Sequence, residues 1–516
     1  MDRGVVLKKL EAGMISGCGP CVPLLTEEDV NATPTIVGQM GPEPFLQAMM
    51  AHLDVDIIIG GRAYDPAPYV AFCAFHALRR SPGPIMSLDR DILGGFTYMG
   101  KIMECGGLCA LPKSRSAMAT IYEDGIFDVR PLSPGSRCTP TSVAAHTMYE
   151  KTRPDLLHGP GGAINLNHTK YSTLSDDISI RVQGAIFESS KEAGGYYTIK
   201  LEGARVKGYR TIFMGSFGDP ILIPQLPTLL DAVKVYVKQQ HAHVIEKWEL
   251  GFHIYGNKGM EVTDPPSTTV PREVFLVGEA LAETQAVATS IASTARVACV
   301  HAPYKGQKAT SGNFGMGIGG KLEIETGACA EFSLYHLMEL DEGGEGAVGI
   351  DETGVDNDLN ALFTWEVKWL GSGSTDRPSP PYIARHEEDL TEIIPSTKTN
   401  GIETPSITPR TLGEVAKVIR SKNAGPYEIT LDVIFDDEAV YHHIKESGSL
   451  KPEVIAQLYS LPVEDLIWCG FFDQALAFKA TLPRTRHGKP FASGSYMEND
   501  VHGSQQYLPL MNVILT

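Results

Sequence analysis

The chain has 516 residues, of which 43% are hydrophobic and 21% are charged. These values are ordinary for a folded globular protein of two or three domains, and they exclude a disordered or fibrous chain. The formal net charge of −18 argues against nucleic acid as a partner. No stretch approaches the ~20 apolar residues of a membrane span, and the charged start MDRGVVLKKLEAG is unlike a signal peptide. We therefore expect a cytoplasmic protein with no membrane contact, whose cysteines stay reduced.

The first sixty residues alternate in the way that α/β proteins do. Residues 5–13 read as a helix, and a loop with Cys18-Gly19-Pro20-Cys21 follows. Thr26 and Asp29 are spaced almost as in a capping box, which predicts the start of a second helix. Residues 45–53 read as a helix, and VDIIIGG at 55–61 reads as a buried parallel strand that ends in glycine.

The middle of the chain is richer in β-structure. Residues 119–211 contain short β-like runs separated by turn residues. Helical periodicity predicts a helix over 226–248 and a second, with a face of small residues, over 277–299. A glycine-rich loop occupies 310–320, and residues 341–409 have the acidic and then Gly-, Ser- and Pro-rich composition of a linker.

The tail restarts as a small α+β domain. Its pattern predicts helices over 412–423, 438–446 and 452–461 and strands over 427–435, 465–472 and 475–483. We therefore predict an α/β fold class in three parts: a large α/β domain with a mixed β-rich portion (1–340), a linker-like segment (341–409) and a C-terminal α+β domain (410–516).

Three motifs resemble known sites but lack the surrounding structure that each site needs. The CGPC motif has no helix starting at its first cysteine, so we interpret it as a turn and not as a redox dithiol. GFTYMGK has the spacing of a phosphate-binding loop but places Ile102 where Ser or Thr belongs. Gly315, Gly317 and Gly320 fit G-x-G-x-x-G, but the following run reads as a strand, so we expect no dinucleotide site. No metal-ligand spacing is present either.

Two short segments combine residues that could carry chemistry. Arg62 and Asp65 follow the predicted strand 55–61, where ligands of α/β sheets bind, although an Arg–Asp pair that ties down the loop is an equal reading. Lys101, Glu104 and Cys105 lie in an apolar, glycine-rich setting that could raise the pKa of a carboxylate. A surface Lys–Glu pair on a helix is the alternative.

Further candidates are more dispersed. His146, Tyr149 and Glu150 are predicted to lie within one helical turn, with His146 and Glu150 on the same face. A core histidine is the alternative for His146. Side chains that could contact a carboxylate or phosphate follow later in the chain: Arg210, Asp219, His301 and Asn313.

Several blocks together resemble the acyclic terpene utilisation (AtuA) family. They are TIVGQMGPEPFLQAM, DIIIGGRAYDP, GKIMECGG, SVAAHTMYEK with HGPGG, YTIKLEGARVKGYRT and HAPYKGQKATSGNF. The tail, with LGEVAKVIRSKNAGPYEITLDVIFDD and LAFKATLPR, resembles the small partner domain that often accompanies this family, which implies a ferredoxin-like α+β unit. The resemblance also implies a further α/β stretch before residue 1, so that part of a site could come from another protomer. The family carries no settled catalytic residues onto these positions.

The first functional hypothesis is a cofactor-independent lyase or isomerase, of hydratase or dehydratase type. Its substrate would be an unsaturated or hydroxy carboxylic acid, free or as a CoA thioester, and the enzyme a homo-oligomer. This chemistry needs a base, an acid and a carboxylate clamp. We assign Glu104 and His146 as base and acid, Asp65 as their orienting group, and Arg62 and Lys101 as the clamp. Tyr149, Arg210, Asp219, His301 and Asn313 would line the same pocket.

Two alternatives remain open. The chain could be a non-catalytic acyl-binding subunit whose tail docks a partner enzyme. It could also be a thiol enzyme that uses Cys105 as its nucleophile.

Overall fold

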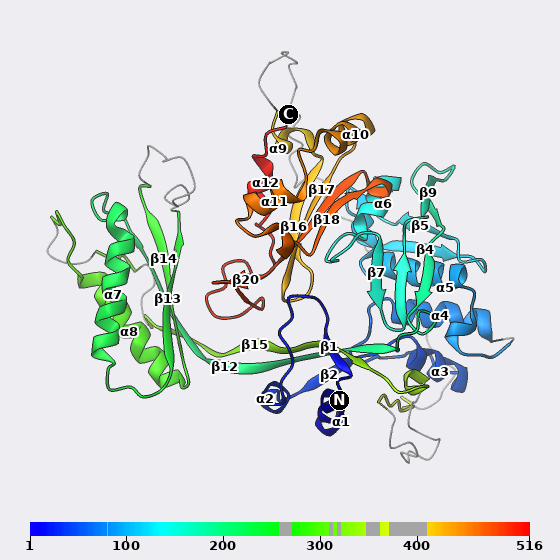
Figure 1. Cartoon of the computed structure of the whole chain (residues 1–516), viewed down its shortest axis with the longest axis horizontal. Helices are drawn as coiled ribbons and strands as arrows, with labels where there is room; N and C mark the ends of the chain where they lie inside the picture. The colour runs from blue at the N-terminus through cyan, green and yellow to red at the C-terminus, as the bar shows by residue number, and fades with distance from the viewer. Residues whose placement is uncertain are drawn as a thin grey trace.

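The computed structural model describes residues 1–79, 81–256, 271–308, 313–316, 321–346, 362–370 and 410–515. Helices and sheets are mixed along the chain, which confirms the coarse prediction of an α/β protein. A long central sheet connects an arm at one end with a lobe at the other, and the C-terminal domain stands above it (Figure 1). None of the described helices is both long and apolar enough to cross a membrane. Most of the predicted linker 341–409 lies outside the described residues.

The central sheet is built on two long antiparallel strands. Its order is β1-β15-β12-β14-β13, with β2 also paired to β12. The bounds are β1 (Ile15–Gly17), β2 (Ile36–Gln39), β12 (Thr198–Phe217), β13 (Trp248–Tyr255), β14 (Val274–Ala282) and β15 (Ile324–Glu339). Helix α1 (Arg3–Glu11) begins the chain, and α2 (Glu27–Ala32) follows it before β2. The predicted capping box of Thr26 and Asp29 is confirmed and starts α2.

The arm consists of two helices packed on the distal part of this sheet (Figure 1). They are α7 (Leu226–Gln240) and α8 (Gln285–His301), and the small buried residues Ala288, Ala292 and Ala295 let α8 approach β12 and β14 closely. The predicted helix 226–248 ends at Gln240, and residues 277–282 belong to β14 and not to a helix. Pairing with two neighbouring strands overrides the local helical pattern there.

The lobe packs α3 (Glu43–Ala51), α4 (Ala67–Leu78) and α5 (Arg90–Met103) against two small antiparallel sheets. These sheets have the orders β4-β5-β10-β9 and β11-β8-β7. Their strands are β4 (Ala117–Ile121), β5 (Phe127–Pro131), β7 (Leu156–Gly159), β8 (Gly162–Asn165), β9 (Lys170–Thr173), β10 (Ile180–Gln183) and β11 (Ile186–Ser189). The short pair β3 (Ala110–Leu111) and β6 (Arg137–Cys138) leads into α6 (Pro140–His146).

The prediction of a buried strand over 55–61 is wrong. The segment is irregular, and Ile57 and Ile59 are 75% and 91% exposed. An apolar run alone cannot show whether a neighbouring strand is present to cover it, and here the parallel contact is a single bridge between Met40 and Ala63. Arg62 and Asp65 therefore lie on a loop beside β2 and not at the end of a buried parallel strand.

Helix α5 packs closely against neighbouring loops of the lobe. A Cβ placed on Gly95 would overlap the carbonyl oxygen of Gly125, and one on Gly94 would overlap that of Ala185. Glycine at these positions lets the helix backbone touch neighbouring loops, which fixes the helix and the residues at its C-terminal end.

Replacing Gly95 by alanine is expected to destabilise the fold by about 1–3 kcal/mol, because the clash outweighs the better helix propensity of alanine. The shift of the urea unfolding midpoint measures this effect. Gly218→Ala is the matched control, since a Cβ there meets nothing within 4 Å. Equal midpoints for the two variants would contradict the close packing of α5.

The C-terminal domain has a four-stranded antiparallel sheet in the order β16-β17-β19-β18. Its elements are α9 (Leu412–Val415), β16 (Val418–Asn423), β17 (Glu428–Ile434), α10 (Glu438–Ser447), α11 (Pro452–Leu458), β18 (Trp468–Phe472) and β19 (Ala477–Pro483). The domain combines helices and strands, but residues 418–423, half of the expected helix 412–423, form strand β16. The order β-β-α-α-β-β also differs from the β-α-β-β-α-β order of ferredoxin-like units, which corrects that expectation.

Candidate functional site

Lys101, in the last turn of α5, is the centre of a buried charged cluster. Gly100 packs against Pro66, and this close approach brings the end of α5 beside the loop that carries Asp65. Lys101 is only 6% exposed and its amine contacts the Glu104 carboxylate. The predicted cluster of Lys101 and Glu104 is thus a buried pair and not the surface pair of the alternative reading.

The protonation of Lys101 is strongly perturbed. Burial and the neighbouring Lys151 ammonium lower the pKa of Lys101 to about 7, against the opposing effect of the Asp65 carboxylate. Burial, followed by the charge of Lys200, also lowers the pKa of Lys151. At neutral pH this cluster therefore contains an amine that can accept or donate a proton.

Lys151 reaches the cluster through the loop that follows α6. The helix ends at His146, and Glu150 has a positive φ of 59°, which turns the chain sharply. This turn corrects the prediction that His146 and Glu150 share a helical face. Sequence reasoning missed Lys151, although it directly follows Tyr149 and Glu150 in the block SVAAHTMYEK.

The C-terminal domain holds this loop in place. Lys479 donates to the backbone oxygen of Met148 at 2.9 Å, and Thr481 donates to that of Thr152 at 2.7 Å. The Thr152 hydroxyl in turn donates to Glu428 at 2.6 Å. The position of Lys151 therefore depends on a sheet more than 270 residues further along the chain.

The same domain contributes two cations. Arg420 and Lys422, on β16, lie 5.4 and 5.7 Å from the ring centre of Tyr149. Arg420 also donates to the Ala145 carbonyl at 3.0 Å, and Lys422 lies 3.7 Å from the Glu150 carboxylate. Tyr149 is thus a packing surface for cations, and the candidate site lies where the lobe meets the C-terminal domain.

Arg62 and Lys200 are joined to the cluster through Glu202 of β12. Arg62 forms two hydrogen bonds with that carboxylate, of 2.7 and 3.2 Å, and contacts Asp65 at 3.1 Å. Lys200 lies 2.8 Å from Glu202, and the charge of Lys200 acts on Lys151. The Arg62–Asp65 pair does tie down its loop, and it does so at the edge of the candidate site.

His146 is neutral at pH 7. Burial, helped by the charges of Lys101 and Arg420, lowers the pKa of His146 to about 4, while a hydrogen bond with the Ile102 backbone opposes the shift. An imidazole with so low a pKa is a weak base. Lys101 is better matched to proton transfer at neutral pH than His146, the residue predicted for that role.

The cysteines near the cluster differ in exposure, and the thiol-enzyme alternative for Cys105 stays a prediction. Cys105 is exposed next to Glu104. Burial raises the pKa of Cys18 to about 12 and that of Cys21 to about 11. The CGPC segment forms a turn closed by a hydrogen bond from Val22 to Gly19, with no helix at the first cysteine, as predicted.

Four predicted site residues lie in the arm, away from Lys101. Arg210 pairs with Glu279 at 3.1 Å, and Asp219 accepts a hydrogen bond from Tyr304. Asn313 is buried and donates to the Ala302 carbonyl at 2.7 Å, while His301 is the exposed last residue of α8. These contacts hold the arm together, so the structure does not place the four residues in one pocket with the cluster.

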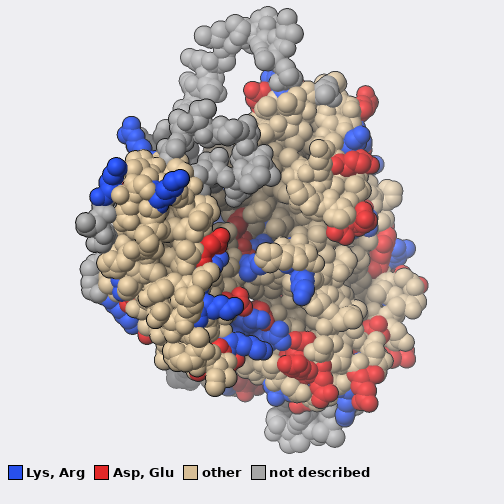
Figure 2. Space-filling view, turned by 60° about the vertical axis from the view of Figure 1, so that its left-hand side comes forward, with Lys and Arg blue, Asp and Glu red and all other residues tan. Residues whose placement is uncertain are grey.

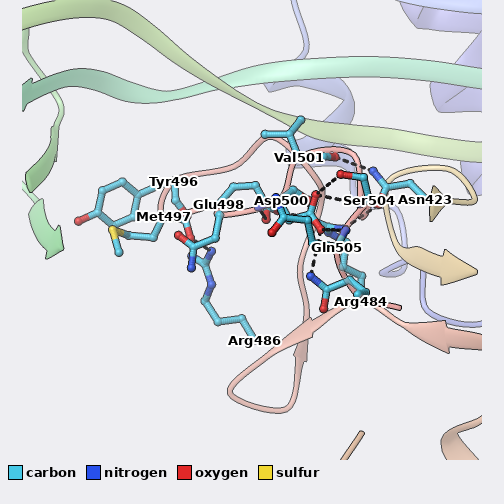
Figure 3. Close-up of polar contacts among 12 residues, drawn as sticks. Asn423, Arg484, Arg486, Tyr496, Met497, Glu498, Asp500, Val501, Ser504 and Gln505 are labelled. Carbon is cyan, nitrogen blue, oxygen red and sulfur yellow. Dashed lines mark hydrogen bonds and ion pairs between the residues drawn. The ribbon is translucent and has the colours of Figure 1, made fainter. Parts of the chain in front are cut away.

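A C-terminal loop links the arm to the tail domain. The guanidinium of Arg486 donates to the carbonyls of Tyr496 and Met497, whose side chains point toward the arm (Figure 3). The backbone N–H of Met497 donates to the carboxylate of Glu279, in the arm, at 3.2 Å. The same carboxylate also pairs with His253 at 2.7 Å.

The surface shown in Figure 2 is hollowed near its centre, with basic and acidic side chains gathered around the hollow.

The other two motifs remain without a site. The G-x-x-x-x-G-K run lies inside α5 and has no loop geometry. Gly315 forms a bridge with Ser216, while Gly317 and Gly320 lie outside the described residues. Among the described residues, no group of three His, Cys, Asp or Glu side chains is arranged to hold a metal ion.

Comparison with protein families places both parts of the chain. Residues 27–314 match the model of the acyclic terpene utilisation family protein AtuA. Residues 412–514 match a domain of unknown function, DUF4387. No curated protein and no solved structure gives a match. Because the first match spans more than half of the chain and includes the lobe with Lys101 and Lys151, the chain belongs to the acyclic terpene utilisation (AtuA) family.

Proposed function

We propose that the chain is a cofactor-independent lyase or isomerase that transfers a proton next to the carbonyl of a carboxylic acid. The substrate would be an unsaturated or hydroxy acid, free or as a CoA thioester. The observation that carries this proposal is Lys101, which is buried in contact with the Glu104 carboxylate and lies close enough to Lys151 and Asp65 to feel their charges. A buried amine with a pKa near 7 suits general acid–base catalysis at neutral pH.

The surrounding charges suit an anionic substrate. Lys200 and Lys422 carry positive charges at the rim of the cluster, from β12 and from the C-terminal domain. Each now faces a carboxylate, Glu202 or Glu150, that a substrate carboxylate could join or displace. In this proposal Lys101 and Lys151 transfer the proton, Glu104 and Asp65 orient them, and the rim cations bind the acid.

Isotope incorporation tests the proposal. The purified full chain is incubated with a panel of unsaturated and hydroxy acids and their CoA thioesters, in deuterium oxide and separately in heavy-oxygen water. Deuterium next to the carbonyl indicates proton transfer, and heavy oxygen in a new hydroxyl indicates hydration. Binding without any label would overturn the catalytic proposal in favour of an acyl-binding subunit.

Lys422→Ala is expected to raise KM by about ten-fold and to change kcat little, because a rim cation binds substrate and transition state alike. Steady-state kinetics on the acid that exchanges fastest measures the effect. Lys417→Ala is the control, since this lysine of the same domain is exposed and paired with Asp436 at 3.2 Å. A KM for Lys422→Ala equal to that of the control would show that the C-terminal domain does not contact the substrate.

A homo-oligomeric state and a cytoplasmic location are part of this proposal. The subunits would be expected to associate in solution, and light scattering of the full chain measures their number. These two predictions are independent of the chemistry assigned to Lys101.

A further inference from the structure

A small cavity in the lobe contains a buried tyrosine hydroxyl. The cavity has a volume of about 20 Å³, which is room for about one water molecule or one hydroxyl group. Its walls are mostly apolar, and the residues that line it include Tyr64, Leu93, Thr97, Gly159 and Phe187. Tyr64 is only 8% exposed, and its hydroxyl has no hydrogen-bond partner among the described residues. Buried tyrosine hydroxyls usually have a partner, so this one is available to a ligand.

The two hydroxyl groups that line the cavity have complementary roles. Thr97 donates its proton to the Leu93 carbonyl at 2.7 Å, so its oxygen can only accept a hydrogen bond from a ligand. Burial and the charge of Asp65 raise the pKa of Tyr64, so the phenol keeps its proton at neutral pH and can donate it. The hydroxyl group of a ligand is both donor and acceptor, and it can therefore satisfy both groups.

The cavity adjoins the charged cluster of the candidate site. Leu93, Thr97 and Lys101 follow one another at four-residue spacing on α5, so they share one face of the helix. Side chains at this spacing start about 6 Å apart, a distance that a small acid can span. On the other wall, Tyr64 directly precedes Asp65, whose loop packs against the end of α5. A hydroxyl group in the cavity therefore lies about one helical turn from Lys101.

We propose that Tyr64 and Thr97 bind the hydroxyl group of a hydroxy carboxylic acid. This deepens the proposed function and rests on it for the position of the acid at the cluster. The rim cations hold the carboxylate, and the hydroxyl group enters the cavity. Because the cavity has room for about one such group between apolar walls, it distinguishes a hydroxy acid from the same acid without its hydroxyl.

Matched acids test the proposal. Binding of 2-hydroxybutyrate, 3-hydroxybutyrate and butyrate to the purified full chain, as free acids and as CoA thioesters, is measured by titration calorimetry. We expect one of the hydroxy acids to bind about ten-fold more tightly than butyrate, which corresponds to one well-placed hydrogen bond. Tyr64→Phe removes a single oxygen atom and should abolish this preference, by weakening the binding of the hydroxy acid alone. Thr97→Val should reduce the preference in the same way.

Tyr98→Phe is the matched control. Tyr98 is fully buried on the same helix, but its hydroxyl is hydrogen-bonded to that of Tyr171 at 2.6 Å. This variant should keep the wild-type preference, and circular dichroism checks that all three variants fold. Equal affinity of the wild-type chain for all three acids, no binding of any of them, or a preference that survives in Tyr64→Phe would overturn the proposal.

Binding and isotope exchange together separate this inference from the proposed function. Loss of the hydroxyl preference in Tyr64→Phe, with no label entering any acid, would support the hydroxyl site and refute the lyase or isomerase. Label that enters acids bound without any hydroxyl preference would do the reverse.

Discussion

Replacing Lys101 by methionine is expected to lower the rate of proton exchange into substrate by about a hundred-fold to ten-thousand-fold, the usual contribution of a general acid or base. Methionine has nearly the length of lysine, but it leaves the Glu104 carboxylate without its partner, so some loss of stability is expected and the fold is checked before the rate is interpreted. Deuterium incorporation followed by mass spectrometry measures the rate, and circular dichroism checks the fold. Lys321→Met is the control, because Lys321 is exposed and pairs with Glu325 at 3.2 Å outside the cluster. Exchange by Lys101→Met at the control rate would remove Lys101 from the mechanism.

The pH dependence of the exchange rate is a second test of Lys101. The pKa of Lys101 is lowered to about 7, so exchange should rise with pH as the amine loses its proton near that value. The charge of Lys151 lowers the pKa of Lys101, so removing that charge is expected to raise it. In Lys151→Met the rising limb of the profile should therefore move to higher pH, with activity partly restored there. A profile that keeps its midpoint would mean that Lys151 does not set the protonation of Lys101.

Replacing Lys479 by methionine is expected to destabilise the chain by about 3–5 kcal/mol, because it leaves part of a buried ion pair without its partner. Lys479 is fully buried and lies 2.8 Å from Asp432, which is itself 2% exposed. Lys479 also holds the Met148 carbonyl, so its loss should loosen the loop that carries Lys151. Urea unfolding measures the loss, and hydrogen exchange of residues 146–153 measures the loosening.

Lys445→Met is the control for this experiment. Lys445 pairs with Asp473 at 2.6 Å, but its side chain is 38% exposed, so its loss should cost at most about 1 kcal/mol. Unchanged exchange at residues 146–153 in Lys479→Met would contradict the role of the C-terminal domain in positioning Lys151.

Lowering the pH should also destabilise the chain, because Lys479 and Arg420 hold the pKa of Asp432 below its usual range. Stability from this carboxylate is present at neutral pH and is lost as the pH falls through its folded-state pKa.

The individual components of the site were visible in the sequence, but their grouping was not. Arg62, Asp65, Lys101, Glu104 and His146 are recognisable as charged or titratable residues in glycine-rich surroundings. Arg210 and Asp219 have the same local appearance, yet they stabilise the arm. Residue type and spacing do not distinguish the two groups, because the difference lies in contacts between segments far apart in the chain.

Local signals determined much of the secondary structure by themselves. The capping box at Thr26, the helix 45–53 and the α+β character of the tail depend on neighbours within a few residues, and sequence pattern predicts such features well. Residues 55–61, 277–282 and 418–423 were predicted wrongly because pairing partners decide between strand, helix and irregular backbone. The tertiary structure alone placed Lys151 beside Lys101 and β16 beside Tyr149. Burial and charge proximity set the pKa of an amine, and both arise only when the separate segments pack together.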